Sequence, residues 1–214
     1  MRVTKYITTV LALVLLLISG TSNAVIIGGK DWRQVTDTTG YSWNDFDAIF
    51  DTSTGACDVV GCLLDNGAST VNLTGYTWAN NFEVNDLLTS YSGVAGFSSL
   101  TSANSVDQGP GALDDFFNDF SATSTGTFND QIAGRTRDQS IGNDRSHDLV
   151  SVLRWHGSAD NFSDRTILTV GFRADRDLSI GGWVYKNVPE PSIIALFGLG
   201  LLGLGFSRRR KVQA

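Results

Sequence analysis

The sequence predicts a single α+β domain with short helices, long loops and a late antiparallel sheet. Three observations lead to this fold class. Short amphipathic stretches lie within the first 120 residues of the 214-residue chain, and the clearest strand-like runs, rich in Val, Ile and Leu, begin at residue 149. Segments of Gly, Ser, Thr, Asn and Asp at 92–111 and 121–146 separate them and predict the long loops. A β-sandwich is the alternative architecture.

The first 24 residues have the order of a secretory signal peptide. Arg2 and Lys5 precede an apolar run at 10–18, and Ser22 and Ala24 place small residues where a signal peptidase reads them. We therefore expect export and cleavage after Ala24. A retained transmembrane helix is the alternative, but the apolar run is short for one.

Residues 25–187 are expected to form the extracytoplasmic domain. Between residues 25 and 188 there are 10 Lys and Arg against 21 Asp and Glu, a net charge of −11. A domain this acidic repels phosphate backbones, so no nucleic-acid partner is expected.

The two cysteines, Cys57 and Cys62, are separated by four residues. In an exported protein this pair predicts a disulfide that closes a small loop. No histidine lies nearby to complete a zinc site, and the C-x-x-C spacing of most redox pairs is absent, although a redox-active pair stays an alternative.

Three short helices are predicted. The first begins after Ser42, with Asp45 as its capping-box partner and apolar residues at 43, 46 and 50. The second begins after Asn80, with Glu83 as the partner, and its apolar face is expected to include Trp78, Phe82, Leu88 and Tyr91.

The third helix is predicted at Leu113–Phe120, where four apolar residues follow the i, i+3, i+4, i+7 pattern. Its other face carries Asp114, Asp115 and Asp119. These acids predict a solvated helix face, with a calcium cluster as the alternative.

The clearest strands lie late in the chain. Val, Ile, Leu and aromatic residues are enriched at 149–155, 166–173 and 180–186, and a further strand is expected at 31–36.

The strongest pattern is the C-terminal segment 188–211. Pro189, Glu190 and Pro191 precede a 14-residue run at 193–206 that is free of polar side chains, and a basic stop follows at Arg208, Arg209 and Arg210. The prolines keep the motif out of a regular helix, and the basic end places the tail in the cytoplasm. The run spans a membrane when flanking serines join it and the arginines reach the headgroups.

This three-part segment resembles the PEP-CTERM sorting domain. The resemblance implies recognition at Pro189, Glu190 and Pro191 by an exosortase, a membrane-embedded protease, after anchoring through a C-terminal transmembrane helix. It further implies a Gram-negative producer, often one that makes exopolysaccharide or biofilm matrix. In such a cell the precursor is anchored in the inner membrane, the product is then at the cell surface or extracellular, and exopolysaccharide is a candidate partner. An ordinary single-pass anchor is the alternative, and it predicts no cleavage.

Two weaker resemblances concern the domain. The segment Trp32–Leu88 is similar to a recurring N-terminal module of PEP-CTERM proteins, through Gly75–Ala79 and Glu83–Leu87. Together with Val170–Arg173 it also resembles the C-type-lectin-like folds of formylglycine-generating enzymes, without their catalytic cysteines.

No catalytic constellation is evident, so we expect a non-enzymatic domain without cofactor or metal. A secreted hydrolase using His156 and a carbohydrate-binding module are the alternatives; His147 has no second histidine at ligand spacing. The candidate side chains for stacking on a sugar are Trp155, Trp183 and Tyr185, each of which core packing would also explain.

Overall fold

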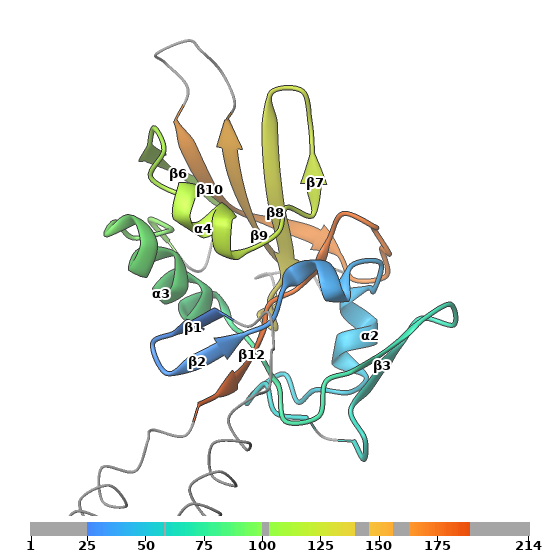
Figure 1. The fold of residues 1–214 in the computed structure, drawn as a ribbon. Coiled ribbons are helices and arrows are strands. Elements are labelled where there is room, and N and C mark those ends of the chain that lie inside the picture. The colour runs from blue at the N-terminus through green and yellow to red at the C-terminus, as the bar shows by residue number, and fades with distance from the viewer. Residues whose placement is uncertain (1–24, 58, 100–102, 140–145, 156–162, 189–214) are drawn as a thin grey trace, which may run out of the picture.

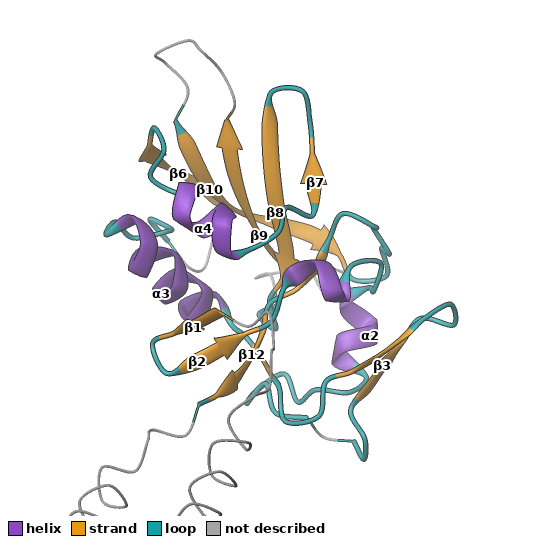
Figure 2. Ribbon diagram, viewed as in Figure 1, coloured by secondary structure: helices purple, strands orange, loops and turns teal. Residues whose placement is uncertain are grey.

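The computed structural model describes residues 25–57, 59–99, 103–139, 146–155 and 163–188 of the chain. Strands make up most of the regular structure in this part, and the helices are few and short (Figure 2). The domain is therefore sheet-rich, in agreement with the broad form of the predicted fold class.

The larger sheet has six strands in the order β11-β8-β9-β10-β6, with β7 paired to β8. Its pairs are antiparallel except β11 with β8, which is parallel. The strands are β6 (Asn104–Gly109), β7 (Ser124–Thr125), β8 (Asn129–Arg135), β9 (Ser146–Trp155), β10 (Asp164–Phe172) and β11 (Gly181–Gly182).

Two helices pack on one face of this sheet, α3 (Asn81–Ser92) and α4 (Asp114–Asp119), as Figure 1 shows. Apolar side chains of β8, β9 and β10 meet both helices in one buried core. In that core the ring of Phe116 lies 4.8 Å from that of Phe120 and 6.2 Å from that of Trp183. The late antiparallel sheet expected from the sequence is thus the frame on which the helices pack.

A second, four-stranded antiparallel sheet has the order β1-β2-β12-β5. It joins β1 (Val25–Ile27) and β2 (Lys30–Trp32) from the start of the described chain to β12 (Val184–Asn187) from its end and to β5 (Thr77–Trp78). The first and last strands of the domain therefore belong to one small sheet.

Aromatic residues around Trp78 form a second core. The rings of Trp43 and Phe46 both lie 5.2 Å from that of Trp78. This core is covered by α2 (Trp43–Asp47), by the hairpin of β3 (Leu63–Asp65) and β4 (Thr70–Asn72), and by the disulfide between Cys57 and Cys62 that the sequence predicts.

Both predicted capping boxes are present. The Ser42 hydroxyl accepts a hydrogen bond from the Asp45 amide at 3.2 Å, and the Asn80 side chain accepts one from the Glu83 amide at 2.8 Å. Each box satisfies amides that the first turn of a helix leaves without partners. The third helix forms close to its predicted bounds, without a side-chain cap.

The strand predicted at 180–186 is wrong as a single element. It divides at Trp183 into β11, which pairs with β8, and β12, which pairs with β2 and β5 in the other sheet. The crossing needs glycine, because a Cβ atom on Gly181 would lie 2.1 Å from the Val35 carbonyl oxygen and one on Gly182 would lie 2.3 Å from the Phe46 ring.

The loops predicted at 92–111 and 121–146 are also wrong in part, because they contain β6, β7 and β8. β6 and β8 are rich in Asn, Asp and Gly, which are depleted in strands, and they are held by pairing with β10 and β9, respectively. The short strand β7 pairs with β8. The strand predicted at 31–36 ends at Trp32, and a 3-10 helix, η1 (Val35–Thr38), follows it.

Phe82 does not join the apolar face of α3 as expected, since it is 63% exposed. The buried residues of that helix are instead Asn81, Val84, Leu87 and Leu88.

Candidate functional site

The C-terminal segment leaves the described fold beside the turn between β1 and β2. The backbone amide of Val188 donates a hydrogen bond of 2.9 Å to the Gly29 carbonyl, one residue beyond the end of β12. Asn187 lies opposite Lys30 in the ladder. The described chain also starts in this sheet, at Val25 in β1, so both ends of the domain lie in one small sheet, with β2 between β1 and β12 (Figure 1).

β12 is held on both sides only over its first half. Val184 and Tyr185 pair with β5, whereas the pairing with β2 continues from Tyr185 to Asn187. The Arg33 amide adds a hydrogen bond of 3.0 Å to the Val184 carbonyl. The strand is therefore an inner strand up to Tyr185 and a one-sided strand beyond it.

Glu83 connects this strand to α3. Its Oε1 accepts a hydrogen bond from the Tyr185 hydroxyl, and its Oε2 accepts one of 2.9 Å from the Asn80 amide. Burial, and then the hydrogen bond to Glu83, raise the pKa of Tyr185, so this hydroxyl keeps its proton and remains a donor. The ring of Tyr185 also lies 5.1 Å from that of Trp32.

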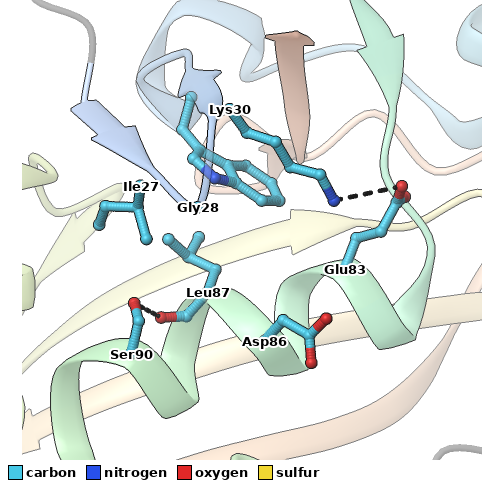
Figure 3. A pocket seen from close by; sticks show the side chains of 8 residues that line it. Ile27, Gly28, Lys30, Glu83, Asp86, Leu87 and Ser90 are labelled. Atoms are coloured by element: carbon cyan, nitrogen blue, oxygen red, sulfur yellow. Dashed lines mark hydrogen bonds and ion pairs between the residues drawn. The ribbon is translucent and has the colours of Figure 1, made fainter. Parts of the chain in front are cut away.

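A small hollow of about 180 Å³ lies between the β1–β2 hairpin and α3 (Figure 3). Figure 3 shows the Lys30 ammonium directed toward Glu83 across it, at 3.4 Å, and the same ammonium lies 4.4 Å from the centre of the Tyr185 ring. The wall is apolar at Ile27 and Leu87 and acidic at Asp86. Because its one ammonium is already paired, the hollow offers no free charge to an anionic ligand.

A buried polar network joins α3 to the larger sheet. The Asn81 side chain donates to Asp148 at 2.6 Å and accepts from the Thr136 hydroxyl at 2.7 Å, and the Asn81 amide donates to Asp138 at 2.7 Å. Burial raises the pKa of both Asp138 and Asp148. The network satisfies buried polar groups, and no hydroxyl or thiol in it is placed beside a base as an activated nucleophile would be.

His147 lies in β9 with only 1% of its surface exposed, and its ring stacks on that of Trp43 at 6.3 Å. Burial, followed by the charges of Arg135 and Arg173, lowers its pKa to about 3. This histidine is therefore neutral at physiological pH and packed in the interior.

Several predicted residues lie outside the described residues. They are the signal-cleavage residue Ala24, the motif Pro189, Glu190 and Pro191, the basic stop Arg208, Arg209 and Arg210, and His156. The predicted membrane helix at 193–206 lies there too, and no helix within 25–188, as far as that range is described, is long and apolar enough to cross a bilayer.

Of the aromatic candidates for sugar stacking, Trp183 and Tyr185 are core residues with 0% and 5% exposure. They present no ring face to a glycan, so the alternative of core packing is confirmed for these two residues, and Trp155 at the end of β9 is half-buried. The acids of α4 lie on an exposed face, where Asp119 accepts a hydrogen bond from the Tyr91 hydroxyl at 2.6 Å. Across the described ranges, no three His, Cys, Asp or Glu residues are grouped as metal ligands.

The sequence did not reveal the contacts that matter most for this site. Tyr185 and Glu83 are 102 residues apart, and Asp148 and Asn81 are 67 apart. No local pattern signals partners at such a separation.

Comparison with known proteins identifies one family segment. The model of the PEP-CTERM protein-sorting motif matches residues 187–211. No curated protein and no solved structure matches the chain.

Proposed function

We propose that this protein, which carries a PEP-CTERM protein-sorting motif, is an exported, exosortase-processed component of the cell surface or extracellular matrix, and that its domain has no catalytic role. The match at 187–211 carries the proposal, since this motif implies an exosortase-targeted secreted protein with a membrane-associated precursor.

The fold supports this arrangement at both ends of the domain. The expected signal-peptidase cleavage after Ala24 would make Val25, the first residue of β1, the first residue of the mature chain. At the other end, β12 ends at Asn187, the residue at which the matched segment begins, and Pro189 of the motif lies two residues further on. A folded domain bounded in this way by the two processing segments loses no strand when they are removed.

The absence of a catalytic role is part of the proposal, and two features support it. The buried, neutral His147 is unavailable as a general base, and the carboxylates Asp138 and Asp148 are engaged with Asn81. We therefore propose that the protein acts through the surface of its folded domain, after export to the cell surface or matrix.

The test is mass spectrometry of the C-terminus of the full-length chain, expressed in a host with an exosortase and in the same host without it. We expect loss of the segment Arg208–Lys211 only where the exosortase is present. A Glu190→Ala variant should retain that segment, whereas Asp86→Ala, outside the motif, should be processed normally. Retention of the basic end by the wild-type chain in the exosortase host would disprove the proposal.

A further inference from the structure

The sorting motif follows the folded sheet without a spacer. The matched segment begins at Asn187, which is the last residue of β12 and lies opposite Lys30 in β2. Val188, the second matched residue, is hydrogen-bonded to Gly29. The first two residues of the sorting segment are thus part of the domain.

This geometry leaves little chain for a protease to bind. Four residues separate Val188 from Ile193, the first residue of the apolar run, so the extended chain spans at most about 17 Å between the Cα atoms of these two residues. A protease binds its substrate as an extended strand on both sides of the cleaved bond, so it would also need residues before Pro189. Those residues are held by β2 in the folded state.

The first half of β12 is paired more extensively than its end. Up to Tyr185 the strand pairs on both sides, and Tyr185 is fixed by Glu83 and Trp32. From Lys186 to Val188 the backbone pairs with the β1–β2 hairpin alone, and Asn187 is exposed. Terminal residues with few contacts separate from a sheet at a small free-energy cost, so residues 186–188 are expected to detach from β2 easily. The contacts of Tyr185 with Glu83 and Trp32 would prevent the separation from extending further along β12.

We propose that exosortase cleavage requires residues 186–188 to separate from β2, so that β2 limits the processing of the folded precursor. The inference rests on the proposed function. It adds that the folded domain limits the access of the protease to the sorting motif. The rate of cleavage would then follow the population of the open strand end.

A disulfide between β2 and β12 tests this directly. The Val188–Gly29 hydrogen bond makes Asn187 and Lys30 a non-hydrogen-bonded pair, whose Cα atoms lie about 4.5 Å apart, within the range that a disulfide spans. We would compare full-length Lys30→Cys/Asn187→Cys with both single variants in the exosortase host. A matched control, Ser105→Cys/Ile167→Cys, links opposite residues of β6 and β10 in the other sheet.

We expect the oxidised β2–β12 double variant to accumulate as precursor, with a processing rate lower by about tenfold or more, and a reductant to restore cleavage. The single variants and the β6–β10 control should be processed as the wild type is. A six-residue Gly-Ser spacer after Val188 should restore cleavage of the oxidised double variant, because the protease no longer needs residues 186–188.

Processing of the oxidised double variant at the wild-type rate would overturn the inference and leave the proposed function intact. So would a spacer that fails to restore its cleavage, because the block would then not lie in access to the motif. If the wild-type chain itself were uncleaved, the proposed function would fail and the inference with it.

Discussion

The hydroxyl of Tyr185, in the last strand, donates a hydrogen bond to Glu83, in the first turn of α3. The same carboxylate completes the capping box of that helix and pairs with Lys30 of β2. A single side chain therefore ties α3 to both β2 and β12. It is also the only glutamate between residues 25 and 188.

We expect Glu83→Ala to lower the free energy of unfolding by about 3 kcal/mol, from a lost helix cap and a lost hydrogen bond of Tyr185. Glu83→Gln keeps one oxygen to accept from the Asn80 amide, and its NH2 group can donate to the Tyr185 hydroxyl, so it should lose only about 1 kcal/mol. Asp86→Ala, an exposed residue of the same helix, should change stability by less than about 0.5 kcal/mol. Urea denaturation of the exported protein measures the series, and equal losses for Glu83→Ala and Asp86→Ala would contradict it.

Gly182→Ala should be strongly destabilising, by about 3 kcal/mol, because its Cβ atom would overlap the fully buried ring of Phe46. That ring is also stacked on the ring of Trp78, at 5.2 Å. Gly67→Ala is the control, since its Cβ would meet nothing within 4 Å and only the left-handed backbone costs about 1 kcal/mol. Thermal unfolding of the two variants gives the comparison, and the prediction is wrong if Gly67→Ala is the less stable.

Asp148 predicts a specific pH dependence. Burial raises its pKa above 3.8, so the folded state holds the proton to a higher pH than the unfolded chain does, and stability is lost as the pH rises through the raised pKa. The side chain that Asp148→Asn introduces does not titrate. Its oxygen can still accept the hydrogen bond that the side-chain amide of Asn81 donates. Between about pH 4 and about pH 7 we therefore expect this variant to gain stability relative to the wild type.

The control for that titration is Asp51→Asn. Hydrogen bonds from Ser53 and Thr54 lower the pKa of Asp51 to about 2, so its stabilising effect is lost only in stronger acid, as the pH falls toward that value. The difference between Asp51→Asn and wild type should be constant above about pH 5. Denaturation curves measured between about pH 4 and about pH 7 test the prediction. If the difference in unfolding free energy between Asp148→Asn and the wild type were also constant over this range, the pH dependence could not be assigned to Asp148.

Reduction of the disulfide between Cys57 and Cys62 should lower the unfolding free energy by about 2 kcal/mol, the chain-entropy value for so small a loop. Cys62 is fully buried in the core around Trp78, so the control variant is Cys57→Ala/Cys62→Ala, which adds no polar group there. The reductant should leave that variant unchanged. Sensitivity of the variant to reductant would show that the effect has another cause.

The sequence predicted the helices well because their signals are local. Ser42 with Asp45, and Asn80 with Glu83, each lie three residues apart, and the capping geometry depends on little else. The disulfide between Cys57 and Cys62 was predictable for the same reason.

The strands were harder, because their stability comes from partners elsewhere in the chain. β8 contains only one β-branched residue, Ile132, and is central only because β9 and β7 flank it. The strand predicted at 180–186 divides at Trp183 because its first part pairs in the larger sheet and its last part in the smaller sheet. Hydrophobic periodicity along the chain does not show in which sheet a residue pairs. The anchoring of the motif to β2 depends on the same non-local pairing.

The position of β12 between β2 and β5 has a consequence for biogenesis. In a polypeptide threaded through a membrane amino-terminus first, β1, β2 and β5 would emerge early, while the slot between β2 and β5 stayed empty until the final strand crossed. Unpaired strand edges invite association with other chains, so the nascent product would need protection during this interval. A polypeptide ended early by a premature stop codon would lack both β12 and the sorting motif, so a chain without the motif would also have an incomplete sheet.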